Sequence, residues 1–254
     1  MRSAKTSRKK LYYLLIAYFL LWIVWFEFIL PVNDILPKPS VVLLSFGALW
    51  SDYHLPMNYI ATFSTVYLSL IAAYFALHFS SGLFAKENHL ITTLISSFHS
   101  FSLYVPGIIL GLFLIYWFPH SAYIGFVFIF LTAFFSMLIK YQSEIPKVDN
   151  AYIAAAESMG AGEKIINSRI IWKSVQPALA KHILELHLYA WSVLLMFEYI
   201  KGGYGLGTII RLSLEFRDLS ALFTTAIIIG VTIFIGTLVI KYSEKKFLHW
   251  SRAE

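Results

Sequence analysis

Long apolar runs constrain this chain more than any other feature of its sequence. A helix needs roughly 20 mostly apolar residues to cross the ~30 Å hydrocarbon core of a bilayer. Six stretches reach or approach this length, and none shows the alternation that is typical of a transmembrane strand. We therefore predict six membrane-spanning helices, at about 11–30, 58–79, 90–118, 121–140, 177–199 and 221–240.

The first run is expected to remain as an anchor. LYYLLIAYFLLWIVWFEFIL is longer than the apolar core of a secretory signal, and no A-x-A-like cleavage site follows it. If this run were removed, five spans would remain. Glu27, near its end, is expected to reach the membrane interface.

The composition excludes an ordinary water-soluble domain. Hydrophobic residues make up 59% of the 254 and charged residues only 13%, whereas soluble domains need a more polar surface. No period of 20–50 residues repeats, and no polar segment is long enough for a second domain. Residues 1–254 are therefore predicted to form one all-α, polytopic membrane domain.

The basic residues predict which ends of the spans face the cytoplasm, because cytoplasmic loops are rich in Lys and Arg. With the N-terminus inside, all but four of the 20 Lys and Arg residues fall on the cytoplasmic side; the four are Lys38, Lys201, Arg211 and Arg217. We expect both termini and the segment 141–176 in the cytoplasm. Topology and anionic lipid then explain the net charge of +6, and no nucleic-acid partner is expected.

The segment 141–176 is rich in small and charged residues, although it lies between two apolar runs. Asp149 or Asn150 can cap a helix over AYIAAAESM, which consists of good helix formers. Gly160 and Gly162 are expected to end it before EKIINSRIIW begins a second short helix. The small side chains would let a partner approach closely. Packing of the same face against the chain's own helices is an equally good interpretation.

Two segments are expected on the outer side. LPKPSVVLLSFGALW is predicted to form a short apolar helix that lies along the interface. KGGYGLGTII contains four closely spaced glycines, which predict a compliant turn before a short helix at about 208–216.

Polar side chains inside the spans are costly, so they are candidates for function. His182 and Glu185 are three residues apart on one helix and can pair directly. We favour a pair that stabilises the bundle over a solute contact, and both remain open. The residues that we expect to line a solute path are Ser102, Tyr104, Pro106, Trp191, Ser192 and Glu198.

Several kinds of chemistry have no support in the sequence. There is no cysteine and no H-E-x-x-H pattern, so no metal site or catalytic residue is predicted. The phosphate-binding pattern G-x-x-x-x-G-K-[ST] is also missing, so ATP would have to be bound by another polypeptide. An intramembrane enzyme that uses His and Glu residues, and a membrane scaffold without transport, remain alternative hypotheses.

The segment around 150–175 resembles a loop shared by the permease subunits of binding-protein-dependent ABC importers. The family pattern is Glu-Ala-Ala, three residues, Gly, nine residues and a closing Ile-x-Leu-Pro. The positions that match are Ala155, Ala156, Gly160 and Ile170, and those that depart from it are Ala154 for the Glu, Trp172 for the Leu and Lys173 for the Pro.

The resemblance implies a type I ABC importer permease fold, with this loop as a coupling helix in a groove of a cytoplasmic ATPase. The residues it implies for that contact are Ala155, Ala156, Glu157, Ser158, Met159, Gly160, Ala161 and Gly162. It also implies two copies of the ATPase, which bind ATP and Mg²⁺, and a second permease copy in a homodimer. It further implies an extracytoplasmic solute-binding protein as a partner and a location in the bacterial inner membrane. No cofactor is expected on this chain.

Other motifs extend the resemblance to a subgroup of these permeases. LPKPS after the first span, Pro106 in the third and GGYGLGTII after the fifth are similar, in this order, to permeases that import sulfonates, taurine, nitrate, bicarbonate and similar solutes. The glycine-rich pattern that is common in span two of these permeases is replaced by STVYLSLIAAYFALHFSSG. The solute itself is not implied, because the external receptor usually selects it in this family.

Overall fold

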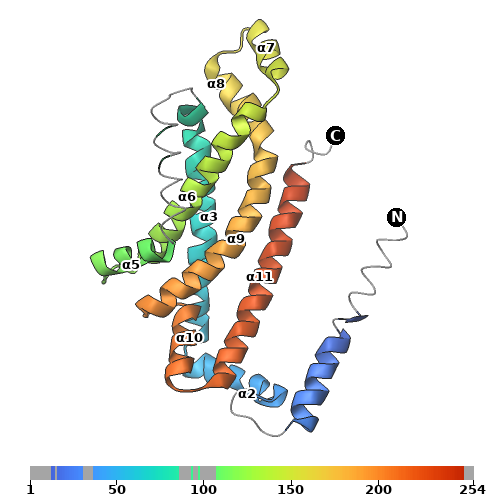
Figure 1. Cartoon of the computed structure of the whole chain (residues 1–254), viewed down its shortest axis with the longest axis vertical. Coiled ribbons are helices and arrows are strands. Elements are labelled where there is room, and N and C mark those ends of the chain that lie inside the picture. The colour runs from blue at the N-terminus through green and yellow to red at the C-terminus, as the bar shows by residue number, and fades with distance from the viewer. Residues whose placement is uncertain are drawn as a thin grey trace. The chain divides into compact units, whose positions relative to one another are not determined.

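The structure is a computed structural model that describes residues 13–14, 16–30, 37–85, 93, 97 and 107–248. Every regular element in these ranges is a helix, and η denotes a π- or 3-10 helix (Figure 1). In chain order the helices are η1 (Trp25–Ile29), α2 (Pro39–Ser51), α3 (Leu55–Ala85), α5 (Gly107–Trp117), α6 (Ile124–Glu144), η2 (Ile145–Lys147), α7 (Asn150–Ser158), α8 (Glu163–Ile165), η3 (Ile166–Ile171), α9 (Trp172–Lys201), α10 (Leu206–Glu215) and α11 (Leu219–Phe247).

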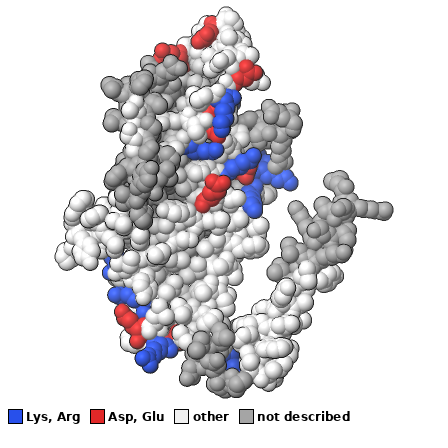
Figure 2. Space-filling view, viewed as in Figure 1, with Lys and Arg blue, Asp and Glu red and all other residues white. Residues whose placement is uncertain are grey.

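Four helical stretches are long and apolar enough to cross a membrane. They are Leu55–Phe84, Ile124–Lys147, Glu163–Lys201 and Leu219–Phe247, which coincide with the second, fourth, fifth and sixth predicted spans. Shorter apolar helices, Ile16–Ile29 and Gly107–Trp117, lie within the other two. In the view of Figure 2, charged side chains gather near the ends of the long helices. The all-α membrane class is confirmed, while six spans and a single domain stay predictions.

Contacts divide the chain into two units, of which the larger comprises Met57–Thr208 and Gly230–Glu254. Its centre is the pair α6 and α9, which share the most extensive contact among the described elements. Phe128 of α6 stacks on Phe197 of α9 with 5.4 Å between ring centroids. The buried side chains of α9 recur at helical spacing, as expected for one face turned to a core: Val175, Leu179, Leu186, Ala190 and Leu194.

The smaller unit comprises Met1–Pro56 and Ile209–Ile229 and contains α2. One face of α2 is buried, and its Ser45 hydroxyl is hydrogen-bonded to the hydroxyl of Thr224. The other face is apolar but exposed, at Leu43, Leu44 and Trp50. A helix with no charged side chain and an exposed apolar face fits the interfacial position that the sequence predicts.

Glu27 has a structural role that the sequence did not predict. Its carboxylate accepts hydrogen bonds from the backbone N–H of Ser40 at 3.1 Å and from the Ser40 hydroxyl at 2.8 Å. Ser40 lies in the first turn of α2, where backbone N–H groups lack partners within the helix and a negative charge is favourable. Glu27 therefore caps α2 from a distance of 13 residues along the chain.

A glycine brings α11 against a polar group inside the larger unit. The Tyr67 hydroxyl of α3 lies 3.0 Å from Nε2 of His187 in α9, and the Trp191 indole N–H donates to the same nitrogen at 3.2 Å. A Cβ on Gly236 of α11 would lie 2.0 Å from the Tyr67 hydroxyl oxygen. The lack of a side chain at Gly236 is thus what lets α11 pack against this pair.

We predict that Gly236→Ala destabilises the protein in detergent by about 1–3 kcal/mol, the usual cost of overpacking. Gly230→Ala is the matched control on the same helix, because a Cβ there meets nothing within 4 Å. It should stabilise α11 by about 0.5–1 kcal/mol. Denaturant unfolding followed by circular dichroism measures both. Equal stability of the two variants would contradict the close approach at Gly236.

Candidate functional site

The helix α7 begins where the sequence predicts. The Asp149 carboxylate accepts a hydrogen bond from the backbone N–H of Ala151 at 2.9 Å, and Asp149 itself has extended backbone angles. This is the geometry of an N-cap, which satisfies one of the free N–H groups of the first turn. The cap fixes where the polar segment changes from an irregular chain into a helix.

The same helix ends in a Schellman motif. The N–H of Gly160 donates to the carbonyl of Glu157 and the N–H of Ala161 donates to that of Ala156, both at 2.9 Å. Gly160 has a φ of 81°, in the left-handed region that glycine adopts without a steric cost. Gly162 has a φ of −76° and precedes α8 as its N-cap. Gly160 is therefore the glycine that this bend requires.

The helix after the bend is longer than predicted. The sequence led us to expect a short second helix and a span starting near 177, but α8, η3 and α9 form one helical stretch, Glu163–Lys201. Pro177 lies inside it, although proline removes a backbone hydrogen bond and usually ends or bends a helix. The π-helical turn η3, a feature common at functional sites, directly precedes α9. The polar segment thus continues into the membrane span without a break.

Trp172, at the start of α9, packs against two other helices. Its side chain is buried, with ring centroids 4.7 Å from His78 and 5.7 Å from Tyr74, both on α3. Tyr141 of α6 lies at 5.7 Å. One turn later, the Gln176 side chain donates to the Tyr74 hydroxyl at 3.1 Å. Trp172 replaces the Leu of the pattern described above, and the larger ring provides these contacts.

The predicted coupling residues form a mostly exposed surface on α7 and the bend after it. Figure 1 shows α7 and α8 together at one end, beyond the ends of α6 and α9. Ala156 is the exception, because it is 5% exposed and faces the chain's own helices. Ala156 therefore packs within the chain, as one of the two interpretations expects, whereas docking of a partner on the exposed residues stays a prediction. The residues at least partly exposed are Ala155, Glu157, Ser158, Met159, Gly160, Ala161 and Gly162.

Sequence reasoning missed two apolar side chains on this surface. Tyr152 is 65% exposed and Ile165 is 54% exposed, beside Met159 at 80%. Their chemistry alone suggested burial, and only the position of α7 at the end of the bundle shows that they face outward. These three exposed apolar side chains lie on α7, at the bend after it and on α8.

Of the predicted solute-path residues, the structure describes only Trp191, Ser192 and Glu198. Ser102, Tyr104 and Pro106 lie outside the described residues. Trp191 is fully buried and donates to His187, whereas the neighbouring Ser192 is exposed and its hydroxyl donates to the Leu188 carbonyl of its own helix. Their role in a path stays a prediction.

Glu198 is committed to the glycine-rich loop that follows α9. Its buried carboxylate accepts hydrogen bonds from the Thr62 hydroxyl at 2.8 Å and from the backbone N–H of Gly207 at 3.0 Å. The Thr62 oxygen in turn accepts the N–H of Leu206 at 2.8 Å. The Asn58 side chain accepts the N–H of Gly205 at 2.7 Å. The first turn of α10 is thus capped by side chains from two other helices.

This loop is held tightly, whereas its four glycines predict a compliant turn. A Cβ on Gly205 would lie 2.1 Å from the Glu198 carboxyl carbon, and one on Gly207 would lie 2.2 Å from the backbone oxygen of Leu195. The glycines allow the backbone to approach Glu198 closely enough for its N–H groups to bond. The sequence shows that the loop is rich in glycine. It does not show that these glycines leave the space that the buried Glu198 carboxylate occupies.

Comparison with known proteins agrees with this geometry. The family described as binding-protein-dependent transport system inner membrane component matches residues 79–249, which include the bend at Gly160 and the loop at Glu198. The chain belongs to this family. It is therefore a permease component of a transport system, as the loop at 150–175 led us to expect. A search of curated protein sequences found no match.

A solved structure shows the same permease fold. The MetNI methionine ABC transporter, in inward-facing conformations, aligns with 78% of this chain and 98% of its own chain, at a TM-score of 0.59 and 13% sequence identity. At this identity the similarity concerns the fold alone. The chain is a permease with the type I ABC importer fold, and its family generally works with ATPase and solute-binding partners.

His182 of α9 contacts two neighbouring side chains in this permease. His182 Nδ1 lies 3.1 Å from the Glu185 carboxylate, as the spacing predicts, and Nε2 lies 2.9 Å from the Ser136 hydroxyl of α6. The histidine thus links two helices, which supports a stabilising role. Within the described ranges, no group of three His, Asp or Glu side chains is placed to hold a metal.

We predict that Glu198→Ala destabilises the permease by about 1–3 kcal/mol for each buried donor that loses its acceptor. Glu198→Gln should cost less, because its side-chain oxygen can still accept one of the two bonds. Glu185→Gln is the control, since the Glu185 side chain is 77% exposed on the same helix. Thermal unfolding in detergent measures all three. Glu198→Ala with the stability of the unmodified protein would show that the loop is held by other contacts.

Proposed function

We propose that this permease imports a small solute, which an extracytoplasmic binding protein delivers, and that a separate cytoplasmic ATPase provides the energy. The supporting observation is the α7–α8 pair: a bend fixed by Gly160, an exposed apolar surface, and direct continuation into α9. Two copies of the permease would form the path, and two copies of the ATPase would bind ATP and Mg²⁺.

The mechanism follows from the helical connection. Closure of the ATPase dimer on ATP would move α7, and the turn at Gly160 together with the contact between α7 and η3 would keep its angle to the following helix. At 1.5 Å per residue, the 39 residues of Glu163–Lys201 extend about 58 Å, more than the thickness of a bilayer. A tilt at the cytoplasmic end would therefore reach the loop bound by Glu198, and the site would open to one side at a time.

The proposed orientation places α7 in the cytoplasm and residues 202–205 outside. The supporting observation is the excess of Lys and Arg in the N-terminal segment, in 140–176 and in the C-terminal tail. Figure 1 shows α7 and the end of α9 at opposite ends of the larger unit, so the two must face opposite sides if α9 crosses the membrane.

The proposed solutes are small molecules that carry an anionic group, of the sulfonate, taurine, nitrate and bicarbonate kind. The sequence motifs support this class, and so does a cavity of about 350 Å³ at the outer end of α9, which lies at the small end of ligand sites. Glu198, Lys201 and Tyr204 line it. The Lys201 ammonium donates to the Ser121 carbonyl at 2.8 Å and has further donors for an anion.

Co-purification tests the function. A tagged permease, expressed with the genes that neighbour its own, should bring down an ATPase with a Walker motif. Met159→Glu should reduce the amount recovered by about tenfold or more, because a charge replaces an apolar contact worth about 1.5–3 kcal/mol. Tyr204→Glu is the control, since this side chain is 63% exposed at the opposite end of α9.

Two outcomes would contradict the proposal. One is the absence of any ATPase in the purified membrane complex. The other is an ATPase whose recovery falls equally with Met159→Glu and Tyr204→Glu, because the contact would then not be on α7. Mass spectrometry of the purified complex distinguishes these results.

Labelling of single cysteines tests the orientation, and the chain has no cysteine of its own. Tyr204→Cys should react with a membrane-impermeant maleimide on intact spheroplasts. Ser158→Cys should react only after the membrane is permeabilised. The reverse pattern would place α7 outside and would exclude its contact with a cytoplasmic ATPase.

A further inference from the structure

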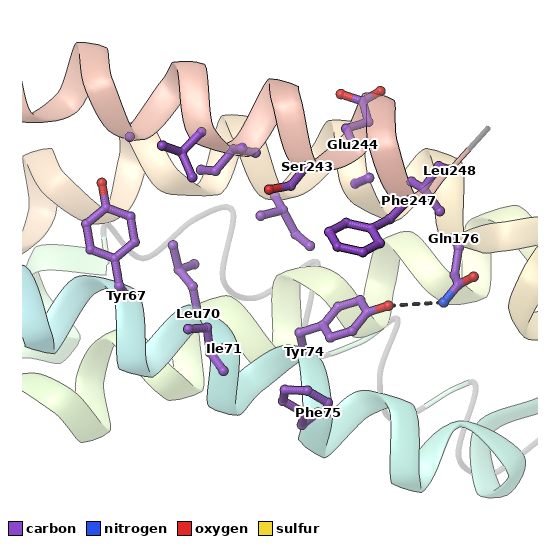
Figure 3. A pocket seen from close by; sticks show the side chains of 15 residues that line it. Tyr67, Leu70, Ile71, Tyr74, Phe75, Gln176, Ser243, Glu244, Phe247 and Leu248 are labelled. Atoms are coloured by element: carbon purple, nitrogen blue, oxygen red, sulfur yellow. Dashed lines mark hydrogen bonds between the residues drawn. The ribbon is translucent and has the colours of Figure 1, made fainter. Parts of the chain in front are cut away.

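A slot of about 610 Å³ runs between α3, α9 and α11 in the larger unit. Figure 3 shows Tyr67, Leu70, Ile71 and Tyr74 on one wall and Phe247 and Leu248 on another. Most of the lining is aliphatic or aromatic. The slot is separate from the coupling surface on α7 and from the loop at Glu198.

The length of the slot matches one leaflet of a bilayer. Its lining on α11 and on the residue that follows extends from Gly236 to Leu248, which at 1.5 Å per residue is about 18 Å. Half of the ~30 Å hydrocarbon core is about 15 Å. The contact of Gly236 with the Tyr67 hydroxyl lies at one end of the slot, so the slot spans about one acyl chain and does not cross the membrane.

The two ends of the slot differ in polarity. The polar lining residues are Gln176, Ser243 and Glu244. Figure 3 shows Gln176 and Glu244 towards the end of the slot that Phe247 and Leu248 line. Exposed lysines lie at the same end: Lys245 and Lys246 are in the last turn of α11. The Lys246 ammonium lies 5.8 Å from the ring centroid of the lining residue Phe247.

The charge at this end suits a phosphate group. Lys245 and Lys246 outnumber the single Glu244 carboxylate, and their long side chains can extend towards the slot while their charges stay in water. Basic side chains beside a pocket between transmembrane helices on the cytoplasmic side are the usual binding site for anionic lipid head groups.

We infer that the slot binds one acyl chain of an anionic phospholipid from the cytoplasmic leaflet, with its phosphate at the lysine end. The assignment to the cytoplasmic leaflet depends on the orientation proposed above, whereas the contact with a lipid does not. The lipid would fill the space between α11 and the α3–α9 pair. Without it, the apolar side chains that line this space would lack packing contacts.

Native mass spectrometry of the detergent-purified full chain tests this inference with added phosphatidylglycerol and phosphatidylcholine. Val239→Trp, which fills the slot, should lower phosphatidylglycerol binding by about tenfold or more, because excluding two methylene groups weakens binding to that extent. Leu238→Trp is the matched control: the two residues are neighbours with exposures of 57% and 50%, but only Val239 lines the slot. The unmodified chain should prefer phosphatidylglycerol.

Equal binding by the two tryptophan variants, or no preference for phosphatidylglycerol, would overturn the inference. So would a disulfide between two copies through Val239→Cys in native membranes, because a second permease would then cover the slot. If Val239→Trp does not fold, a phosphatidylglycerol with a photoreactive acyl chain can be used on the unmodified chain. Crosslinks at residues 67–75 and 236–248 support the site, and crosslinks confined to other surfaces contradict it. Failure to find an ATPase would leave these measurements unchanged.

Discussion

One continuous helix, Glu163–Lys201, determines how the two ends of this permease are related. At its cytoplasmic end, as proposed, Trp172 is buried among rings of α3 and α6. At the other end Glu198 accepts the N–H of Gly207. Because both attachments are made by side chains of the same helix, a movement of the first turn cannot be absorbed by a loop before it reaches the glycine-rich segment.

Contacts between helices also explain why polar groups occur in the apolar interior. A polar group removed from water is costly unless it is hydrogen-bonded. In this permease several of these hydrogen bonds join two helices. His182 links α9 to Ser136 of α6, and His187 links α9 to Tyr67 of α3. Glycine has the matching role on the backbone, since Gly207 and Gly236 allow contacts that any side chain would block. Specific helix positions thus come from polar bonds and small residues rather than from apolar packing alone.

Much of the fold could be predicted from the sequence, because hydrophobic length and helix caps are local properties. Four spans, the Asp149 cap and the glycine bend are found where the pattern indicates. The sequence did not reveal that the helix after the bend continues into the span, since Pro177 favours a break. It also suggested a compliant loop where Glu198 binds the backbone, because that bond joins residues from separate helices. Partners distant in sequence leave no periodic signal.

The central claim is that α7 and α9 move as one body. Spin labels on Ser158→Cys and Glu185→Cys, both at exposed positions, report the distance between the two helices in a chain without other cysteines. Pulsed electron spin resonance should give a narrow distance distribution whose mean stays the same when the ATPase partner and ATP are added. A broad distribution, or a mean that shifts with ATP, would show that the bend at Gly160 flexes and would contradict the rigid connection.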